Sequence, residues 1–336
     1  MAKIGVLGAG TWGIALAKML SENGHEVTVW SAVQKELDAL TETHRHPNLS
    51  GVTIPAEIVY TPSVEEACVG KDVVMFSVAS PYVRATAAKA AAFLTPAQVI
   101  VDVAKGIEAD TLMTMSQIIE DELKKAQPQA AFRIVALSGP THAEEVARDL
   151  PTAIVSSSKD DAAAKYVQEV FMNTCMRVYT NTDMLGVELC GALKNIMALA
   201  AGVSSGLGFG DNAKAALITR GMAEITRLGL AMGCSEQTFL GLAGIGDLIV
   251  TATSMHSRNN RCGYRIGQGI PVDQAVHEVG MVVEGIHAIP AAMRLAQQYN
   301  VEMPIVEMAD AVVGGRVTPK EAVRQLMTRN KKPETR

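Results

Sequence analysis

Two lysines, Lys105 and Lys194, each lie close to a glycine, downstream of a loop with the spacing Gly8-x-Gly10-x-x-Gly13. A glycine loop of this spacing can hold a dinucleotide, and a lysine can bind an alcohol oxygen and accept its proton. These residue types, in this order along the chain, predict a nicotinamide-dependent dehydrogenase.

The glycine loop lies between an expected strand at residues 3–7 and an expected helix. Glycines permit a tight turn and the close approach of a pyrophosphate, while the helix N-terminus supplies free N–H groups. We therefore expect cofactor contacts from the loop glycines. Trp12 either lines the cofactor or packs against the protein, and the loop as a whole has an alternative interpretation as a turn that binds nothing.

The second expected strand, residues 26–30, ends in the sequence Trp30-Ser31-Ala32. Proteins specific for NAD place an acidic residue here to bind the ribose hydroxyls, and an arginine nearby accommodates the phosphate of NADP. Neither residue type is present at this point, so the choice between NAD and NADP stays open.

Lys194 has the strongest sequence context of the two lysines. On a helix it would share one face with Gly191, Asn195 and Ala198, which are spaced by three and four positions. Burial on such a face lowers the pKa of a lysine toward the range in which it accepts a proton at neutral pH. We predict that Lys194 is a catalytic base; the alternative is a surface lysine whose stem alone is buried.

Further along the chain, Asp247 lies in an apolar stretch without other charges. A buried carboxylate is costly unless it is paired, and Lys194 is the partner that we expect. A role as a helix N-cap is the alternative.

A polar triplet, Ser257, Arg258 and Asn259, has the pattern of a helix start, with Ser257 as the cap. Arginine, an amide and free helix N–H groups together predict a phosphate pocket. An exposed basic helix start is the alternative.

Two further segments follow expected strands. Lys105 follows residues 99–103, at the carboxyl end of the sheet where open α/β folds bind ligands, although a solvated loop lysine is the alternative. The turn that contains Gly139 and Thr141 follows residues 132–137, and Pro140 is expected in the first position of a helix. This turn forms another edge of the site, or it is only a helix cap.

The first half of the chain alternates strand and helix patterns, which predicts an α/β Rossmann-type, doubly wound parallel sheet. The expected strands are residues 3–7, 26–30, 72–78, 98–103, 132–137, 152–156 and 176–179, and helices are expected at 34–43, 82–93 and 160–171. From residue 183 onward helical periodicity dominates and no strand is expected. We therefore predict a dinucleotide-binding domain at residues 1–181 and an all-α domain at 182–336, with the chemistry between them.

Composition limits the partners. The net charge of -5 argues against nucleic acid, and five dispersed cysteines argue against a disulfide framework or a zinc site, which favours the cytoplasm. The isolated histidines predict no metal ligands. The N-terminal apolar stretch is interrupted by glycines, unlike a signal peptide, and the longest uncharged run, 195–210, is too short to span a membrane.

The ordered set of motifs resembles bacterial NAD(P)-dependent glycerol-3-phosphate dehydrogenase from residue 4 to about residue 310. The motifs are the glycine loop, Ala104-Lys105-Gly106, Ser138-Gly-Pro-Thr141, Gly191-Ala-Leu-Lys194-Asn195, Gly206-x-Gly208-Phe-Gly-x-Asn212 with Arg220-Gly221, Gly246-Asp247-Leu248, Ser257-Arg258-Asn259 and Val283-Glu284-Gly285. The resemblance implies interconversion of sn-glycerol 3-phosphate and dihydroxyacetone phosphate with NAD or NADP, which supplies the glycerol backbone of phospholipids.

The resemblance also implies roles for individual residues. Lys194 and Asp247 are implied to be catalytic, and the substrate residues are Lys105, Gly139, Thr141, Lys194, Asn195, Asp247, Ser257, Arg258 and Asn259. The cofactor residues are Gly8, Gly10, Thr11, Trp12, Gly13, Lys105, Ala143, Arg258, Val282 and Glu284. This chain departs from the family at Ala32, where His, Arg or Tyr is frequent, near the adenosine ribose.

Two other functions remain open from the residues alone. A dehydrogenase for a β-hydroxyacid or a sugar acid would also carry a lysine on a helix, but it would not need the Arg258 pocket. A non-catalytic nucleotide sensor would not need Lys194, Asp247 and Arg258 together. We expect a small phosphorylated substrate and no nucleic-acid or membrane partner. The oligomeric state is open, with a homodimer as one candidate.

Overall fold

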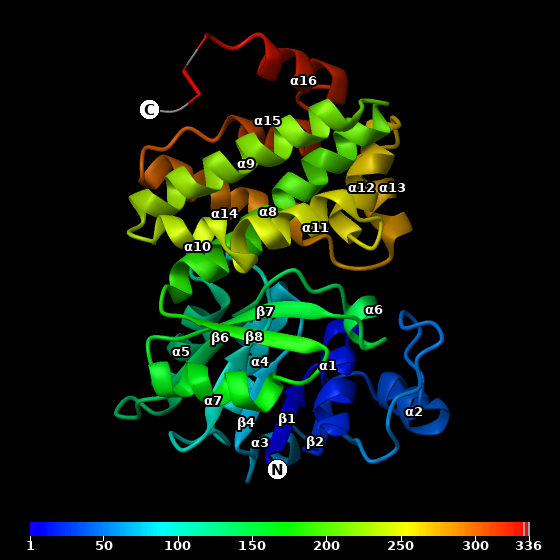
Figure 1. Cartoon of the computed structure of the whole chain (residues 1–336), viewed down its shortest axis with the longest axis vertical. Coiled ribbons are helices and arrows are strands. Elements are labelled where there is room, and N and C mark those ends of the chain that lie inside the picture. Colours follow the sequence, from blue (N-terminus) through cyan, green and yellow to red (C-terminus); the bar gives the residue numbers. More distant parts are fainter. Residues whose placement is uncertain (332, 335–336) are drawn as a thin grey trace. The chain divides into compact units, whose positions relative to one another are not determined.

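The computed structural model describes residues 1–331, 333 and 334, and it divides into two compact units (Figure 1). Unit 1 comprises Met1–Gly191 with Gln237–Asp247, and unit 2 comprises Ala192–Glu236 with Leu248–Arg336. The last strand ends at Asn181, next to the boundary expected between residues 181 and 182. The division into functional domains at that point stays a prediction.

A sheet of eight strands forms the centre of unit 1, in the order β3-β2-β1-β4-β5-β6-β7-β8. Its strands are β1 (Lys3–Leu7), β2 (Glu26–Trp30), β3 (Val59–Thr61), β4 (Val73–Phe76), β5 (Val99–Asp102), β6 (Arg133–Ser138), β7 (Thr152–Ser157) and β8 (Met176–Asn181). Neighbouring strands run parallel except β6 and β7, which are antiparallel. The predicted doubly wound, parallel sheet is confirmed, and its last two strands, β7 and β8, run opposite to the other six.

Helices cover both faces of this sheet, which explains the uninterrupted apolar strands. The helical elements of the same unit are α1 (Thr11–Glu22), α2 (Gln34–Thr43), α3 (Val64–Cys68), η1 (Ser80–Tyr82), α4 (Val83–Ala90), α5 (Met115–Ala126), α6 (Ala143–Val146), α7 (Asp161–Phe171), α10 (Glu236–Leu240) and η2 (Leu242–Gly246). Successive side chains of a strand point to opposite faces. In β4, Val73 and Met75 belong to the core that contains α1 and α7, whereas Val74 and Phe76 belong to the core that contains α3, α4 and α5.

Unit 2 is helical. Helix α8 (Met184–Gly206) continues from unit 1 into unit 2, which also contains α9 (Asp211–Ala231), α11 (Asp247–Thr253), α12 (Arg258–Gly267), α13 (Val272–Val279), α14 (Glu284–Gln298), α15 (Pro304–Val313) and α16 (Pro319–Met327) (Figure 1). Beyond Asn181 the described residues contain no strand. The prediction of an all-α second half is confirmed.

Helix α8 is the one helix of the described chain that is long and apolar enough to cross a membrane, and 83% of its apolar window is buried. That burial is typical of the core helix of a globular protein. The uncharged run at residues 195–210 covers only the second half of this helix. The first half contains the charged residues Glu188 and Lys194, and both are buried.

Within unit 2, α8 and α12 approach each other at glycines. A Cβ atom added at Gly202 would lie 2.1 Å from the carbonyl oxygen of Asn260, and one added at Gly263 would lie 2.0 Å from that of Leu199. No larger residue fits at either position without a shift of the backbone. This contact fixes the N-terminus of α12 next to the middle of α8.

Glu224 of α9 is buried in unit 2 and accepts hydrogen bonds from the backbone N–H of Ile305 at 2.9 and 3.0 Å. Burial raises its pKa to about 7, although these hydrogen bonds act in the opposite direction. The folded state therefore binds more protons than the unfolded state between pH 4.5 and pH 7. The contribution of Glu224 to the free energy of unfolding should fall by at most about 3 kcal/mol as pH rises through this window.

Glu224→Gln should remove this pH dependence, because the amide does not titrate. Denaturant unfolding from pH 4.5 to pH 8 would show the free-energy difference between variant and parent changing steadily in favour of the variant. Glu236→Gln, at an exposed position, is the control and should give a flat difference. A flat difference for Glu224→Gln as well would contradict the prediction.

Candidate active site

The glycine loop lies where the strand order of the sheet reverses, between β1 and β4. Open α/β sheets bind ligands at this point, beyond the carboxyl ends of the strands. Gly8 follows β1 with a φ of 125°, and its carbonyl oxygen accepts a hydrogen bond of 2.9 Å from Ser77 Oγ after β4. A Cβ atom at Gly13 would lie 2.3 Å from the same carbonyl oxygen. The loop therefore closes tightly against the sheet only with glycine at these two positions.

Helix α1 begins at Thr11 immediately after the loop, and Gly10 at its N-cap provides no side-chain hydrogen bond. The first N–H groups of a helix lack an intrahelical acceptor. A Cβ atom at Gly10 would meet nothing within 4 Å, so the backbone here faces open space. These features fit the pyrophosphate of a dinucleotide.

Thr11 and Trp12, in the glycine loop, have defined surroundings. The Thr11 hydroxyl accepts a hydrogen bond of 3.1 Å from Asn48 Nδ2. The half-buried Trp12 packs against the core on the α1 face of the sheet, which favours packing as its main role.

Lys105, after β5, contacts two of the other residues that the sequence predicts to bind substrate. Its Nζ donates to Asp247 Oδ2 at 2.7 Å and to the carbonyl oxygen of Gly139 at 3.1 Å. The Thr141 hydroxyl donates to that same carbonyl oxygen at 3.2 Å. Since Asp247 is only 1% exposed, the lysine cation compensates a carboxylate that would otherwise be costly to bury. The structure thus brings together four of the residues predicted to contact substrate.

The details of these segments correct one expectation. Helix α6 begins at Ala143 with His142 at its N-cap, so Pro140 lies in the preceding turn and not in the first helical position. Asp247 is the first residue of α11, directly after the turn η2. A helix-cap role alone would not account for its ion pair with Lys105.

Two buried carboxyl groups in the same unit were not identified in the sequence analysis. Asp102, the last residue of β5, accepts a hydrogen bond of 3.0 Å from the N–H of Ala104, next to Lys105. Glu188 of α8 accepts from the hydroxyls of Thr114 and Ser116 at 2.9 and 2.6 Å. Burial raises the pKa of Asp102 well above its ordinary value, and the nearby Glu188 raises it further. The available signal was an aspartate at a strand end, three residues before the loop lysine.

Lys194 is buried in α8, with 5% of its surface exposed, and its Nζ donates to the hydroxyl of Thr251 at 2.7 Å. Asp247 and Thr251 lie one turn apart in α11. The surface-lysine alternative is therefore excluded. The expected pairing of Lys194 with Asp247 stays a prediction.

Next to Lys194, the amide of Asn195 joins a chain of hydrogen bonds within unit 2. Asn259 Nδ2 donates to Asn195 Oδ1 at 2.9 Å, and Asn259 Oδ1 accepts from the N–H of Gly285 at 2.8 Å. These bonds link α8 to the first turns of α12 and α14, so Asn195, Asn259 and Gly285 belong to one hydrogen-bonded cluster.

The predicted cap of α12 is confirmed. Ser257 Oγ accepts a hydrogen bond of 3.2 Å from the N–H of Asn260, and Arg258 is the first residue of the helix. Arg258 is half-buried beside a capped helix N-terminus. An anion can be held there by the guanidinium and the helix N–H groups together.

The remaining predicted cofactor residues have the following places. Ala143 is buried at the start of α6 in unit 1. In unit 2, Glu284 is the first residue of α14 and Val282 lies two residues before it. Their contacts with a cofactor stay predictions.

Comparisons with known proteins show the family to which the chain is similar. A family described as NAD-dependent glycerol-3-phosphate dehydrogenase matches in two parts, its N-terminus at residues 3–164 and its C-terminus at residues 183–324. The chain is 63% identical over 334 residues to glycerol-3-phosphate dehydrogenase [NAD(P)+] 2 of Lactobacillus delbrueckii subsp. bulgaricus, covering 99% of both chains. It is 49% identical over 335 residues to glycerol-3-phosphate dehydrogenase [NAD(P)+] of Agathobacter rectalis, covering 99% of this chain and 98% of that one.

Among solved structures, glycerol-3-phosphate dehydrogenase from Coxiella burnetii is 33% identical to this chain. It superposes with a TM-score of 0.92 and covers 98% of this chain and 99% of its own. The similarity therefore extends over both units.

Proposed function

This chain belongs to the NAD-dependent glycerol-3-phosphate dehydrogenase family, and on that basis we propose how its residues carry out the reaction. The enzyme interconverts dihydroxyacetone phosphate and sn-glycerol 3-phosphate with NAD or NADP as cofactor. It is an oxidoreductase that acts on a CH–OH group, so its catalytic groups must bind one oxygen and move one proton.

Lys194 moves that proton. Bound NAD(P)H would supply the hydride for C2 of dihydroxyacetone phosphate. The Lys194 ammonium gives its proton to the C2 oxygen as negative charge develops there, and in the oxidative direction Lys194 accepts this proton from the hydroxyl. The observation that supports this role is the burial of Lys194, with Nζ held in one position by Thr251. A fixed, desolvated ammonium stabilises an alkoxide far better than a solvated one.

Lys105 and Asp247 orient the substrate. Lys105 Nζ is held between the Asp247 carboxylate and the carbonyl oxygen of Gly139, which leaves one ammonium hydrogen for a substrate oxygen. Thr141 and Asn195 supply further polar groups to the oxygen atoms on the three-carbon backbone of the substrate. Asp247 compensates the positive charge that the lysines bring to the site.

Ser257, Arg258 and Asn259 hold the phosphate end of the substrate. The guanidinium provides a charge-assisted, two-point contact, and the N-terminus of α12 adds N–H donors. This pocket distinguishes the enzyme from dehydrogenases that act on unphosphorylated hydroxyacids.

The cofactor is bound by the loop at the strand-order reversal and by residues near the substrate. The loop fits a dinucleotide because its backbone is open at Gly10 and closed against the sheet at Gly13. The proposed cofactor residues are Gly8, Gly10, Thr11, Trp12, Gly13, Lys105, Ala143, Arg258, Val282 and Glu284. We further propose a cytoplasmic location, supported by five cysteines that are all free, and a homodimer as the assembly.

The purified protein tests this function directly. With dihydroxyacetone phosphate, we expect the absorbance of NADH or NADPH to fall, with each cofactor assayed separately. Inorganic phosphate should inhibit by competing for the Arg258 pocket. If a β-hydroxyacid were oxidised and dihydroxyacetone phosphate were not reduced, the proposed substrate would be wrong. If neither were turned over while a nucleotide still bound, a sensor role would replace the catalytic one.

A further inference from the structure

The carboxylate of Glu36, in the following helix, lies at the end of β2, where the strand itself has no acidic residue. Ser31, the residue after β2, is 5% exposed, and its hydroxyl donates to Glu36 Oε2 at 2.7 Å. The same hydroxyl accepts from the N–H of Val33 at 3.1 Å, which turns the chain back toward the strand. Glu36 lies in the first turn of α2, so the helix brings to the strand end the carboxylate that the strand itself does not carry.

This carboxylate lies close to the glycine loop. The N–H of Gly8 donates to the carbonyl oxygen of Trp30, the last residue of β2, at 2.9 Å. In dinucleotide-binding sheets an acid at this strand end binds the ribose hydroxyls of NAD, whereas a nearby arginine accommodates the 2′-phosphate of NADP. Exposed Glu36 can reach a bound ribose because Ser31 occupies only one of its oxygens.

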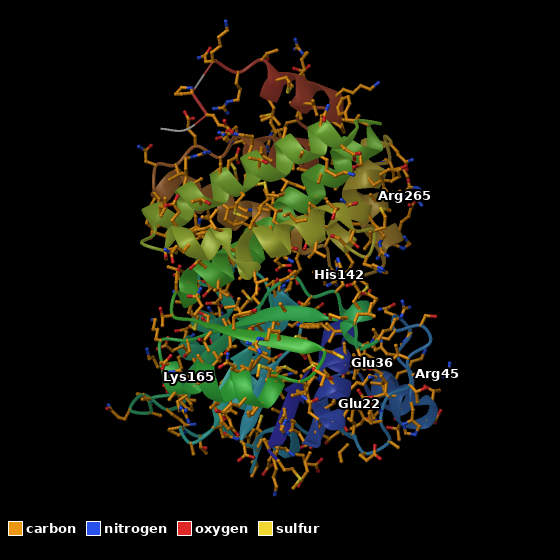
Figure 2. All side chains as sticks on the ribbon, in the orientation of Figure 1. Glu22, Glu36, Arg45, His142, Lys165 and Arg265 are labelled. Carbon is orange, nitrogen blue, oxygen red and sulfur yellow. The ribbon has the colours of Figure 1, made fainter. Side chains whose placement is uncertain are left out.

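The positive charges around Glu36 do not neutralise it. Lys35 and Arg45 are exposed, and in the described part of the chain neither makes an ion pair with Glu36. Figure 2 shows Glu36 and Arg45 as separate side chains on the same side of unit 1. Burial lowers the pKa of the neighbouring His46, although Glu36 acts in the opposite direction, so this ring is mostly uncharged at neutral pH.

We propose that Glu36, oriented by Ser31, makes this enzyme prefer NAD(H) to NADP(H) by binding the adenosine ribose hydroxyls and repelling a 2′-phosphate. This inference rests on the proposed function, since it assigns the cofactor selectivity of the same site. Ala32 is consistent with it, because its exposed methyl group offers nothing to a phosphate.

Calorimetric binding of ADP-ribose and of 2′-phospho-ADP-ribose to the full chain separates selectivity from turnover. The parent protein should bind ADP-ribose at least about tenfold more tightly, because the 2′-phosphate brings up to two negative charges close to Glu36. Glu36→Gln keeps an acceptor for Ser31 but removes the charge, and it should reduce this ratio by about tenfold, mainly through tighter binding of the phosphorylated ligand.

Glu42→Gln is the matched control. It makes the same charge change in the same helix, at an exposed position about 9 Å further along the axis, and should leave the ratio unchanged. Arg45→Gln tests the competing idea that Arg45 grips a 2′-phosphate, and should alter the ratio less than Glu36→Gln does. The double variant Ala32→Arg, Glu36→Gln should bind 2′-phospho-ADP-ribose more tightly than ADP-ribose. Misfolding cannot produce such a gain of affinity.

Equal affinity of the parent protein for the two ligands would overturn the inference, and so would an unchanged ratio in Glu36→Gln. In either case reduction of dihydroxyacetone phosphate would continue, so the proposed function would stand. Failure to bind either ligand, together with no turnover, would overturn both.

Discussion

Lys194→Ala should lower kcat for reduction of dihydroxyacetone phosphate by about 10²- to 10⁴-fold, the usual contribution of a positioned general acid or base. The physical reason is that the alkoxide formed at C2 would lose both its proton donor and the buried positive charge beside it. KM should change far less than kcat, because the phosphate contacts at Arg258 are untouched. Steady-state kinetics at saturating cofactor measures both constants.

Lys194→Arg distinguishes proton transfer from charge alone. The guanidinium keeps the positive charge but does not give up its proton at any accessible pH, so this variant should recover the contribution of the charge at most and remain far slower than the parent. Binding of ADP-ribose should be retained in both variants, because the glycine loop belongs to unit 1 and Lys194 to unit 2. Near-normal turnover by either variant, with intact nucleotide binding, would disprove the assignment of Lys194 as the base.

Most of the sheet could be predicted from the sequence because its strands are buried on both faces. Every residue of β4 is apolar, and so is every residue of β1 after Lys3. Such short apolar runs between turns are typical of parallel strands. Strand β3 was missed since it has only three residues and lies at the edge of the sheet, where one face is open to water. The antiparallel direction of β7 was also missed, because periodicity reports which face is buried and not the direction of the neighbouring strand.

Local features of the site could likewise be predicted, and long-range pairings could not. The cap at Ser257 depends on residues within one helical turn, so its pattern is visible in the sequence. Lys105 and Asp247 are separated by 142 positions, and nothing in either segment identifies the other as its partner. Glu36 is an intermediate case, because it lies only five residues from Ser31. The sequence analysis considered only acidic residues directly at the strand end, and Glu36 belongs to the next helix.

Arg258→Ala should raise KM for dihydroxyacetone phosphate by about 10- to 100-fold, because a charge-assisted hydrogen bond to a phosphate contributes roughly 1.5–3 kcal/mol. The decisive comparison uses dihydroxyacetone, which has the same carbonyl group and lacks the phosphate. If Arg258 recognises the phosphate, kcat/KM for dihydroxyacetone should be almost the same in the variant and the parent. A loss of similar size for both substrates would instead point to a damaged cofactor site, a role also proposed for Arg258, and KM for NADH would then rise as well.

Arg265→Ala is the matched control for this variant. Arg265 lies two turns further along α12 and is exposed, with an ion pair to Glu278 Oε2 at 3.2 Å (Figure 2). Exposed pairs of this kind contribute little to stability, so this variant should fold and should bind both substrates like the parent. The two arginines share one helix but differ in distance from its N-terminus by about 10 Å. An effect confined to Arg258 and to the phosphorylated substrate would therefore assign phosphate recognition to the start of α12 and not to the general positive charge of the helix.

An unchanged KM for dihydroxyacetone phosphate in Arg258→Ala would remove this pocket from the proposed site.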